Sequence, residues 1–458
     1  MMKRRVIIGA PALAVLAVLS TAMLFGQDIK TFISSIGGKP ALAVVDFPGA
    51  GAAAPLMAAF NSTLFNDLQN SALFDLRPKG FFPLGSPRTA ADLRPEDAGG
   101  GYALKDWAGA LVNASHLVFG YAGVTNGVLA LYGNVYDTRQ DAQTAQLLAQ
   151  QYAGSPDEAG AINLAHKFAN DIILRFGGTA SLLDSRIYFT STRGARNQFG
   201  TEVWVMDWDG NNQKQLTHLG GQVAYPAISP DGSRLAFTIW PGTGGQPIIG
   251  MVNSETGRSI SFYNQKASLN AAATFAPDGT HIYYSSSASG TAQIYVAGID
   301  GGGFNRVTST RGNPTEPKVN PKNPDSLLFV DGFPKEQIYR MNAEGSGIER
   351  LTNGEGEAAN PSWSPDGQHI AFAWTRGYAT GDFNIFVADI GSMQDPIQLT
   401  HSEGRNENPV WAPDGKHIVF MSSRAGKVMQ IYSMLANGKQ VKQLTTQGVN
   451  KYPVWGVK

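Results

Sequence analysis

The sequence contains no cysteine, and this absence removes several classes of chemistry at once. Disulfides, thiolate metal ligands and cysteine nucleophiles are all excluded in a chain without a thiol. Charge is also scarce and balanced, because 36 Lys and Arg stand against 36 Asp and Glu and charged residues make up 16% of the chain. Without a long run of one sign, the chain lacks the charge pattern of a protein that tracks phosphates. We therefore expect no nucleic-acid partner.

Long apolar runs are missing except at the N-terminus. Three basic residues at positions 3 to 5 precede an uncharged apolar stretch from Val6 to Phe25, which is the layout of a secretory signal. An uncleaved anchor stays open as an alternative, since about twenty apolar residues can span a bilayer. Pro11 weakens a spanning helix, so we expect residues 1–26 to be a signal peptide and 27–38 to begin the mature chain.

Glycine and proline, by contrast, are plentiful, with 53 and 25 residues. This composition is typical of a chain with many turns and short strands. A Pro-Asp-Gly marker recurs every 41 to 48 residues, with one degenerate copy in "NPKNPDS". That period is typical of a propeller blade and not of a helical solenoid. The aspartates of the five copies are Asp231, Asp278, Asp325, Asp366 and Asp414.

The marker predicts a tight turn. Proline fixes φ, the aspartate can accept a hydrogen bond from its own downstream backbone, and glycine adopts a positive φ without steric cost. A metal or carboxylate cluster is the alternative for one aspartate per repeat. Turns spaced around a ring hold these carboxylates far apart, and no calcium-loop pattern surrounds them. We expect no metal and no cofactor.

The repeats predict a ring that closes on itself. Five complete units, each with four short strand patterns, occupy residues 223 to 450. Before them, residues 186–217 supply the second, third and fourth strands of a sixth unit, and the terminal "KYPVWGVK" matches a missing first strand. We therefore predict a six-bladed β-propeller over residues 184–458, closed by the C-terminal strand so that no open edge remains.

Residues 39–178 have a different pattern. "ALAVVDF" reads as a strand, and the stretches from Pro55 and from Ala161 have helical spacing. Two further strand patterns flank Asn126-Gly127, a strong hairpin signal. The sequence thus predicts a small α/β domain before the propeller, and a fold that is mainly β overall.

These features together resemble the TolB family, the secreted propeller component of the Tol–Pal envelope system. The resemblance covers nearly all of the chain after the signal and rests on the order of the two regions as well as on the repeats. The stretches that carry it are "ALAVVDF", "FNDLQNSALFDL", "DWAGALVNASHLVFG", "AHKFANDIILRFGG", "SRIYFTSTRG" and "EVWVMDWDGNNQKQLT".

The resemblance implies a periplasmic, non-enzymatic adaptor. A Pal-like peptidoglycan-associated lipoprotein would bind at the mouth of the propeller channel, and the mature N-terminal segment would bind TolA. The protein would be peripheral to the membrane and support outer-membrane integrity and constriction at cell division. This sequence departs from the family pattern in the "NPKNPDS" unit, in "RSISFYN", which replaces a Leu-Thr strand ending, and in residues 27–38, which match no family motif residue by residue.

The candidate interface lies in the polar segments just before each first strand. Such loops face one rim of the ring, where a rigid scaffold commonly carries its binding residues. Strand-end capping and solvation are the structural alternative for each residue. The resemblance adds that Asn270 and the Thr315-Glu316 pair match positions that face the bound lipoprotein. The predicted partner-binding residues are Asn270, Ala272, Thr315, Glu316, Asn360, Arg405, Glu407, Asn408 and Lys451.

Two other functions are compatible with a propeller of this repeat type. Related propellers gate serine peptidases, but no Gly-x-Ser-x-Gly elbow occurs here, so we predict no enzyme of that class. A secreted propeller that binds or cleaves a peptide or glycan inside its channel remains the alternative function. The histidines that follow the turns in three repeats, His281, His369 and His417, are expected to be surface strand residues, because separate blades cannot bring them to one metal.

Overall fold

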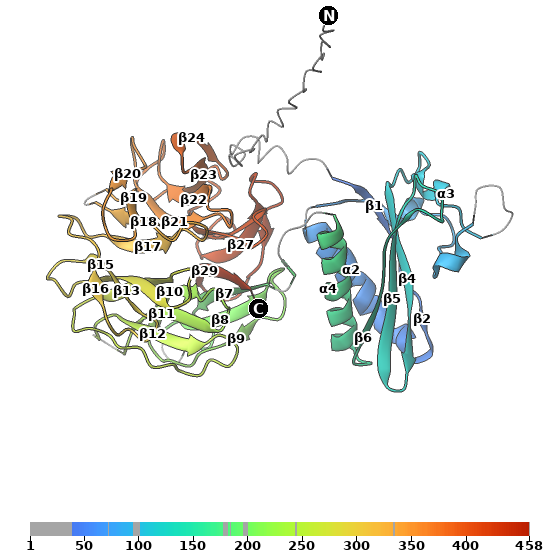
Figure 1. Ribbon diagram of the computed structural model, residues 1–458, viewed down its shortest axis with the longest axis horizontal. Coiled ribbons are helices and arrows are strands. Elements are labelled where there is room, and N and C mark those ends of the chain that lie inside the picture. Colours follow the sequence, from blue (N-terminus) through green and yellow to red (C-terminus); the bar gives the residue numbers. More distant parts are fainter. Residues whose placement is uncertain are drawn as a thin grey trace, which may run out of the picture.

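The computed structural model describes residues 39–457, apart from 72, 95–100, 177–181, 184, 196–199, 243–244 and 333–334. The predicted signal peptide and residues 27–38 lie outside the described residues. An N-terminal α/β region and a propeller lie side by side (Figure 1). No helix within the described ranges is long and apolar enough to cross a membrane.

The N-terminal region is built on one sheet with the strand order β3-β1-β4-β5-β6, and β2 pairs with β4. β1 runs parallel to β3 and β4, while β4, β5 and β6 are antiparallel neighbours. Asn126 and Gly127 both have positive φ between β4 and β5, as the predicted hairpin requires. The strands are β1 Ala41–Val44, β2 Gly49–Ala50, β3 Asp75–Leu76, β4 His116–Thr125, β5 Val128–Asp137 and β6 Gln146–Gly154.

Two long helices cover the face of this sheet that is turned toward the propeller (Figure 1). They bury an apolar stripe each, and Phe60 and Phe168 both pack against the ring of Phe47. Asp157 caps the second helix by accepting a hydrogen bond from the Gly160 N–H. The helices are α2 Met57–Asn70, α3 Lys105–Ala108 and α4 Glu158–Arg175, with 3₁₀ turns η1 Gly51–Leu56, η2 Lys79–Phe81 and η3 Ala90–Asp92.

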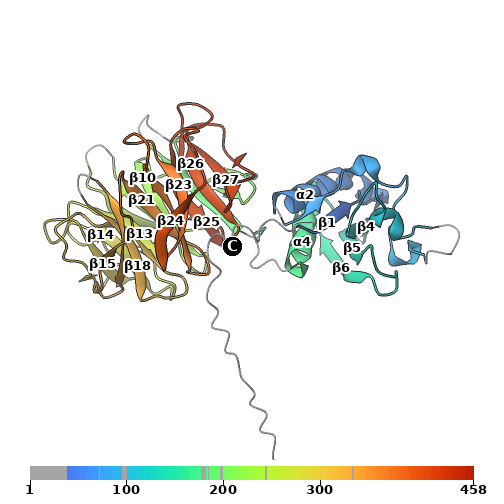
Figure 2. The same cartoon turned by 90° about the horizontal axis from the view of Figure 1, so that it is seen from above.

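The propeller has six sheets arranged around an axis (Figures 1 and 2). Each sheet is antiparallel, and all but one have four strands among the described residues. The exception is the sheet in which "RSISFYN" replaces the Leu-Thr ending, where a single bridge between Val252 and Ser259 takes the place of a fourth strand.

The strands fall into blades in sequence order, apart from the shared one. The first five blades are β10 Gln222–Ile228, β11 Arg234–Trp240, β12 Ile248–Asn253; β13 Asn270–Phe275, β14 His281–Ser286, β15 Gln293–Gly298, β16 Asn305–Arg306; β17 Thr315–Val319, β18 Ser326–Asp331, β19 Gln337–Asn342, β20 Glu349–Arg350; β21 Ala358–Trp363, β22 His369–Trp374, β23 Asn384–Asp389, β24 Ser392–Gln398; and β25 Asn406–Trp411, β26 His417–Ser422, β27 Gln430–Leu435, β28 Lys442–Gln443.

The Pro-Asp-Gly markers form the predicted turns between the first two strands of four blades. In each, an aspartate oxygen accepts a hydrogen bond of 2.8 to 3.1 Å from the backbone N–H two residues on. The following glycine has φ between 66° and 71°. The turn interpretation is confirmed, because both features are those of a side-chain-stabilised turn.

The sixth blade joins the two ends of the propeller. It consists of β29 Asn450–Val457, β7 Ser185–Ser191, β8 Glu202–Asp207 and β9 Lys214–Gln215, with β29 antiparallel to β7. The indole Nε1 of Trp455 donates to Ser185 Oγ at 2.6 Å, which fixes the register of the two strands. The predicted six-bladed ring closed by the C-terminal strand is confirmed.

One histidine connects the propeller to the N-terminal region. His417 Nδ1 lies 2.6 Å from Asp414 Oδ2, and its Nε2 lies 3.0 Å from the carbonyl oxygen of Asn70 at the end of α2. His369 is buried as well and lies 2.8 Å from Asp389. The expectation of a surface position was therefore wrong for both residues, because neighbouring carboxylates and a helix end cover them; His281 alone is exposed.

The closing strand gives a direct test of the ring. Replacing Trp455 by Ala should lower the free energy of unfolding by about 3–5 kcal/mol, because a large buried side chain leaves a cavity. Trp455→Phe keeps part of the packing but loses the bond to Ser185, so its cost should be smaller, about 1–2 kcal/mol. Chemical denaturation of both variants measures the difference.

Removal of the strand itself should be more severe. Deleting residues 452–458 takes most of β29 and opens the edge of β7, whereas deleting 457–458 alone leaves Trp455 in place. We expect the longer deletion to abolish cooperative thermal unfolding of the propeller and the shorter one to preserve it. Equal melting profiles for the two truncations would contradict the shared blade.

Candidate binding site at the channel mouth

A left-handed residue interrupts the innermost strand of every blade. Each of these strands has a register irregularity at the same place, as expected where an extra residue forms a bulge. A non-glycine residue with φ between 49° and 55° stands there in all six. We call these residues the αL ring; they are Tyr225, Ala272, Glu316, Asn360, Asn408 and Tyr452.

Local chemistry explains how these residues tolerate the conformation. Asn360 and Asn408 belong to the residue type that adopts positive φ most readily after glycine. A proline follows in five of the six blades, and proline fixes its own φ while it disfavours the helical region for the residue before it. In four of the six blades the left-handed residue and its proline read "NP" or "YP".

Hydrogen bonds link the αL ring from one blade to the next. The carboxylate of Glu316 accepts bonds from the backbone N–H of Asn360 at 2.9 Å and from its side-chain Nδ2 at 2.9 and 3.1 Å. The side-chain oxygen of Asn360 in turn accepts from the backbone N–H of Asn408 at 3.3 Å. Across the closing blade, the rings of Tyr225 and Tyr452 lie 4.7 Å apart.

Two cavities meet at this ring along the propeller axis. One, of about 520 Å³, forms the channel mouth, and the other, of about 260 Å³, lies on the opposite side of the ring. The mouth is lined chiefly by polar side chains. Five members of the αL ring line both cavities: Tyr225, Glu316, Asn360, Asn408 and Tyr452.

The structure brings most of the predicted interface residues to these cavities. Ala272 lines the inner cavity only. Asn270 lines neither, because its side chain is buried and donates to the carbonyl of Gln265 at 2.9 Å. The predicted residues that line the mouth are Thr315, Glu316, Asn360, Arg405, Glu407, Asn408 and Lys451.

Glu316 is buried, and burial controls its ionisation. Desolvation raises the pKa of its carboxyl group, against the lowering effects of Lys318 and of the bonds from Asn360. Burial likewise lowers the pKa of Lys318 in the inner cavity, and the charge of Glu316 opposes that shift. Glu316 is thus fixed by its neighbours, and its carboxylate holds the lining residue Asn360 in position.

The remaining acidic side chains give the mouth its charge. Burial raises the pKa of Glu407, opposed by Arg405 at 2.6 Å. Burial also raises the pKa of Glu336, and the nearby carboxylates of Glu316 and Glu357 add to the effect. Arg405 and Lys451 are the basic lining residues against four glutamates, and burial raises the pKa of three of these glutamates.

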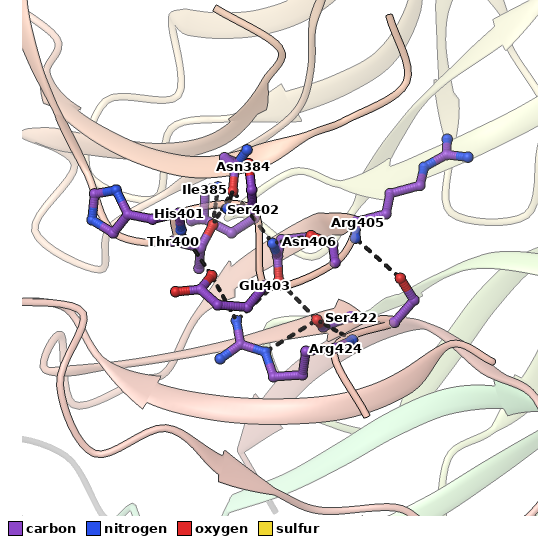
Figure 3. Close-up of polar contacts among 12 residues, drawn as sticks. Asn384, Ile385, Thr400, His401, Ser402, Glu403, Arg405, Asn406, Ser422 and Arg424 are labelled. Carbon is purple, nitrogen blue, oxygen red and sulfur yellow. Dashed lines mark hydrogen bonds and ion pairs between the residues drawn. The ribbon is translucent and has the colours of Figure 1, made fainter. Parts of the chain in front are cut away.

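A polar network fixes the loop that carries Arg405 (Figure 3). Asn384 Oδ1 accepts from the backbone N–H of Ser402 at 2.9 Å, and Asn406 Oδ1 accepts from Ser422 and Arg424. The backbone N–H of Arg405 donates to Ser423 Oγ at 3.0 Å. Figure 3 shows the Arg405 guanidinium pointing away from this network, so a rigid loop presents a half-exposed cation.

Four polar lining residues are missing from the predicted set: Tyr225, Glu336, Glu357 and Tyr452. The two tyrosines occupy the same pre-proline position as Asn360 and Asn408, so the repeat alignment contained a usable signal. Glu357 lies in the polar segment before β21, at the repeat position that Arg405 occupies in the next blade, so the repeat contained a signal for it as well. Glu336 precedes β19, and nothing in the repeat places it at the axis.

The comparisons with known proteins agree with this architecture. The family described as the TolB beta propeller domain matches residues 174–377 and 349–457. The crystal structure of TolB from Acinetobacter baumannii superposes with a TM-score of 0.74 at 20% identity, covering 92% of this chain and 97% of that one. At that identity the superposition shows a shared fold.

Curated relatives match over part of their length. "Protein TolB homolog" of Chlorobium chlorochromatii is 30% identical over 210 residues, which is 46% of this chain and 44% of that protein. "Tol-Pal system protein TolB" of Dinoroseobacter shibae is 29% identical over 247 residues, 54% and 52% of the two chains. The chain thus spans about half the length of these relatives in the aligned regions.

The αL ring can be tested at Asn360. Asn360→Ala should lower the free energy of unfolding by about 2–4 kcal/mol, because it leaves the buried Glu316 carboxylate short of donors and places alanine at positive φ. Asn360→Gly loses the same side chain but accepts the backbone conformation, so it should be less destabilising by about 1 kcal/mol. If the alanine variant has the same free energy of unfolding as the glycine variant, the positive φ of residue 360 causes no strain.

Burial of Glu316 also predicts a pH dependence. Because its folded pKa lies above the ordinary value of 4.5, the folded state binds the proton more tightly, and stability falls as pH rises from about 4.5 through the raised pKa. Glu316→Gln cannot ionise and should flatten this decline. The exposed Glu344→Gln on the same blade should leave it unchanged, as followed by denaturation between pH 4 and pH 8.

Proposed function

Because this chain belongs to the TolB β-propeller family, we propose that it is a non-enzymatic adaptor of a Tol–Pal envelope system. Its partner would be a Pal-like peptidoglycan-associated lipoprotein, bound at the channel mouth. In this role the protein supports outer-membrane integrity and the constriction of the envelope at cell division. The matched regions cover about half the length of the curated relatives, so the role of the whole protein is part of this proposal.

The observation that carries the proposal is the construction of the mouth. Seven of the residues predicted from the sequence line a single polar cavity of about 520 Å³. Rigid backbone supports them, because the αL ring and the loop network restrict their positions before any partner arrives. Such preorganisation favours binding, since little conformational entropy is lost on association.

Location and the second partner follow from the resemblance and the N-terminal sequence. The apolar stretch of residues 6–25 after three basic residues is typical of an exported protein, and we place the mature protein in the periplasm. Residues 27–38 are the segment that would bind TolA. Both segments lie outside the described residues, so these assignments rest on sequence alone.

A bulky residue in the mouth should block the lipoprotein. Thr315 lines the cavity and is partly exposed, so Thr315→Arg fills space that the partner would occupy. We expect at least a tenfold weaker affinity for the soluble domain of the Pal-like lipoprotein from the same cell, or about 1.4 kcal/mol. Titration calorimetry with the purified mature chain measures it.

Charge at the mouth supplies a second variant and its control. Arg405→Glu reverses the half-exposed cation and should also weaken binding. Lys322→Glu makes the same charge change on the turn between β17 and β18, at the opposite end of the blade from Thr315, and should leave affinity unaltered. If the lipoprotein binds all three variants as it binds the native chain, the mouth is not its site.

A further inference from the structure

The sheet of the N-terminal region ends in a long strand that has one strand neighbour among the described residues. β6 is the outermost strand in the order β3-β1-β4-β5-β6, and among the described residues it pairs only with β5 (Figure 2). Every second residue of such a strand directs its N–H and C=O away from its neighbour. A row of backbone donors and acceptors therefore faces outward along most of the nine residues, and at Leu147 the carbonyl oxygen already accepts a bond from Arg175.

This edge has few of the features that usually protect one, apart from a register irregularity at Leu147 near its start. Gln146–Gly154 reads QLLAQQYAG, with no charged residue and no proline, although lysines, prolines and short length normally prevent strand addition. The propeller shows the contrast. Its outer strand β24 is seven residues long but contains Asp395 and Pro396, and β9, β16, β20 and β28 have two residues each. The outer strand β12 has neither charge nor proline, but residues 258–264 cover its edge with hydrogen bonds.

The two faces of β6 differ in what they offer to an added strand. Tyr152 packs against Phe168 and donates to Asp171 Oδ2 at 2.5 Å, so its face is the one covered by α4. Ala149, Gln151 and Ala153 on the other face are all exposed. An incoming strand would meet a partly apolar surface beside Leu148 and Tyr152 on one side and small or polar side chains on the other.

The flank of α4 next to this edge is amphipathic and carries two basic residues and one acidic residue, Asp171, which is already bonded to Tyr152. Arg175 Nε donates to the carbonyl oxygen of Leu147 at 3.0 Å, which places the C-terminal turn of α4 beside the start of β6. Leu174 in the same turn is 45% exposed, and Lys167 lies exposed two turns earlier. An added strand with an apolar side chain beside Leu174 and an acidic side chain beside Arg175 would complement this flank.

The size of the edge decides what kind of occupant fits. Stable interfaces between folded proteins use about 20–30 residues per side, whereas β6 offers nine. A second copy of this chain would therefore be held weakly on this edge alone. A single extended segment is a better match, because main-chain hydrogen bonds supply most of its affinity.

We infer that β6 is a docking edge for an extended peptide segment of another protein, with apolar residues at alternate positions and an acidic residue near Arg175. The segment adds as a further strand beside β6 and packs its helix-side residues against Leu148, Tyr152 and Leu174. The site belongs to the N-terminal sheet and is independent of the channel mouth.

A probe for this edge exists within the chain. A synthetic peptide with the β5 sequence Val128–Asp137 already has a register that suits β6 and places its terminal aspartate at the Arg175 end. Added to the full mature protein, it should slow hydrogen exchange of the β6 amides at least tenfold. The same peptide N-methylated at alternate amides keeps its side chains but loses donors, and should give no protection.

Disulfide trapping gives an independent readout, since the chain has no cysteine of its own. Gln150→Cys should crosslink to the β5 peptide carrying cysteine at its sixth position. Asn305→Cys, exposed on the two-residue edge β16, is the matched control and should not.

Three results would overturn the inference. They are equal protection by the N-methylated peptide, no protection of β6 by the unmodified peptide, and protection that grows with protein concentration in the absence of peptide. The last would assign the edge to a second copy of the chain. Loss of lipoprotein binding in Thr315→Arg leaves this experiment unaffected, so the two proposals fail separately.

Discussion

The left-handed residue in each inner strand is the constraint on which the channel depends. A regular strand would place successive side chains alternately toward the two neighbouring blades along its whole length. The bulge rotates one residue per blade, and these residues meet where the two axial cavities join. Strain of this kind persists only where surrounding contacts hold it, and the bonds from Asn360 to Glu316 and from Asn408 to Asn360 are such contacts.

Much of the fold could be predicted because its determinants are local. The Pro-Asp-Gly turn depends on a few adjacent residues, so its spacing defined the blades, and a strand missing at one end of the repeats appeared at the other. The N-terminal hairpin depended likewise on Asn126-Gly127. The TolB resemblance predicted from residues and their order is confirmed by the family match and the superposed fold.

The site was less predictable, because its properties arise between blades. Glu316 reads as an exposed rim acid in the sequence, yet its carboxylate is buried against a residue 44 positions away. Asn270 has the same polar character but turns inward to Gln265. His417 is covered by a helix end 347 residues earlier in the chain. Burial and pKa shifts depend on such distant neighbours, and a repeat pattern contains no information about them.

The shared sixth blade also affects when the molecule can fold. The bond between Trp455 and Ser185 joins residues 270 positions apart, so the ring closes only after all the other blades have been made. Contacts of such long sequence separation slow folding, because the entropy of a very large loop is lost first. Until then β7 has an open edge, and such intermediates aggregate readily. Once the last strand has paired with β7, neither end of the propeller can unfold without breaking its bonds to the other end. This slows unfolding of the native state.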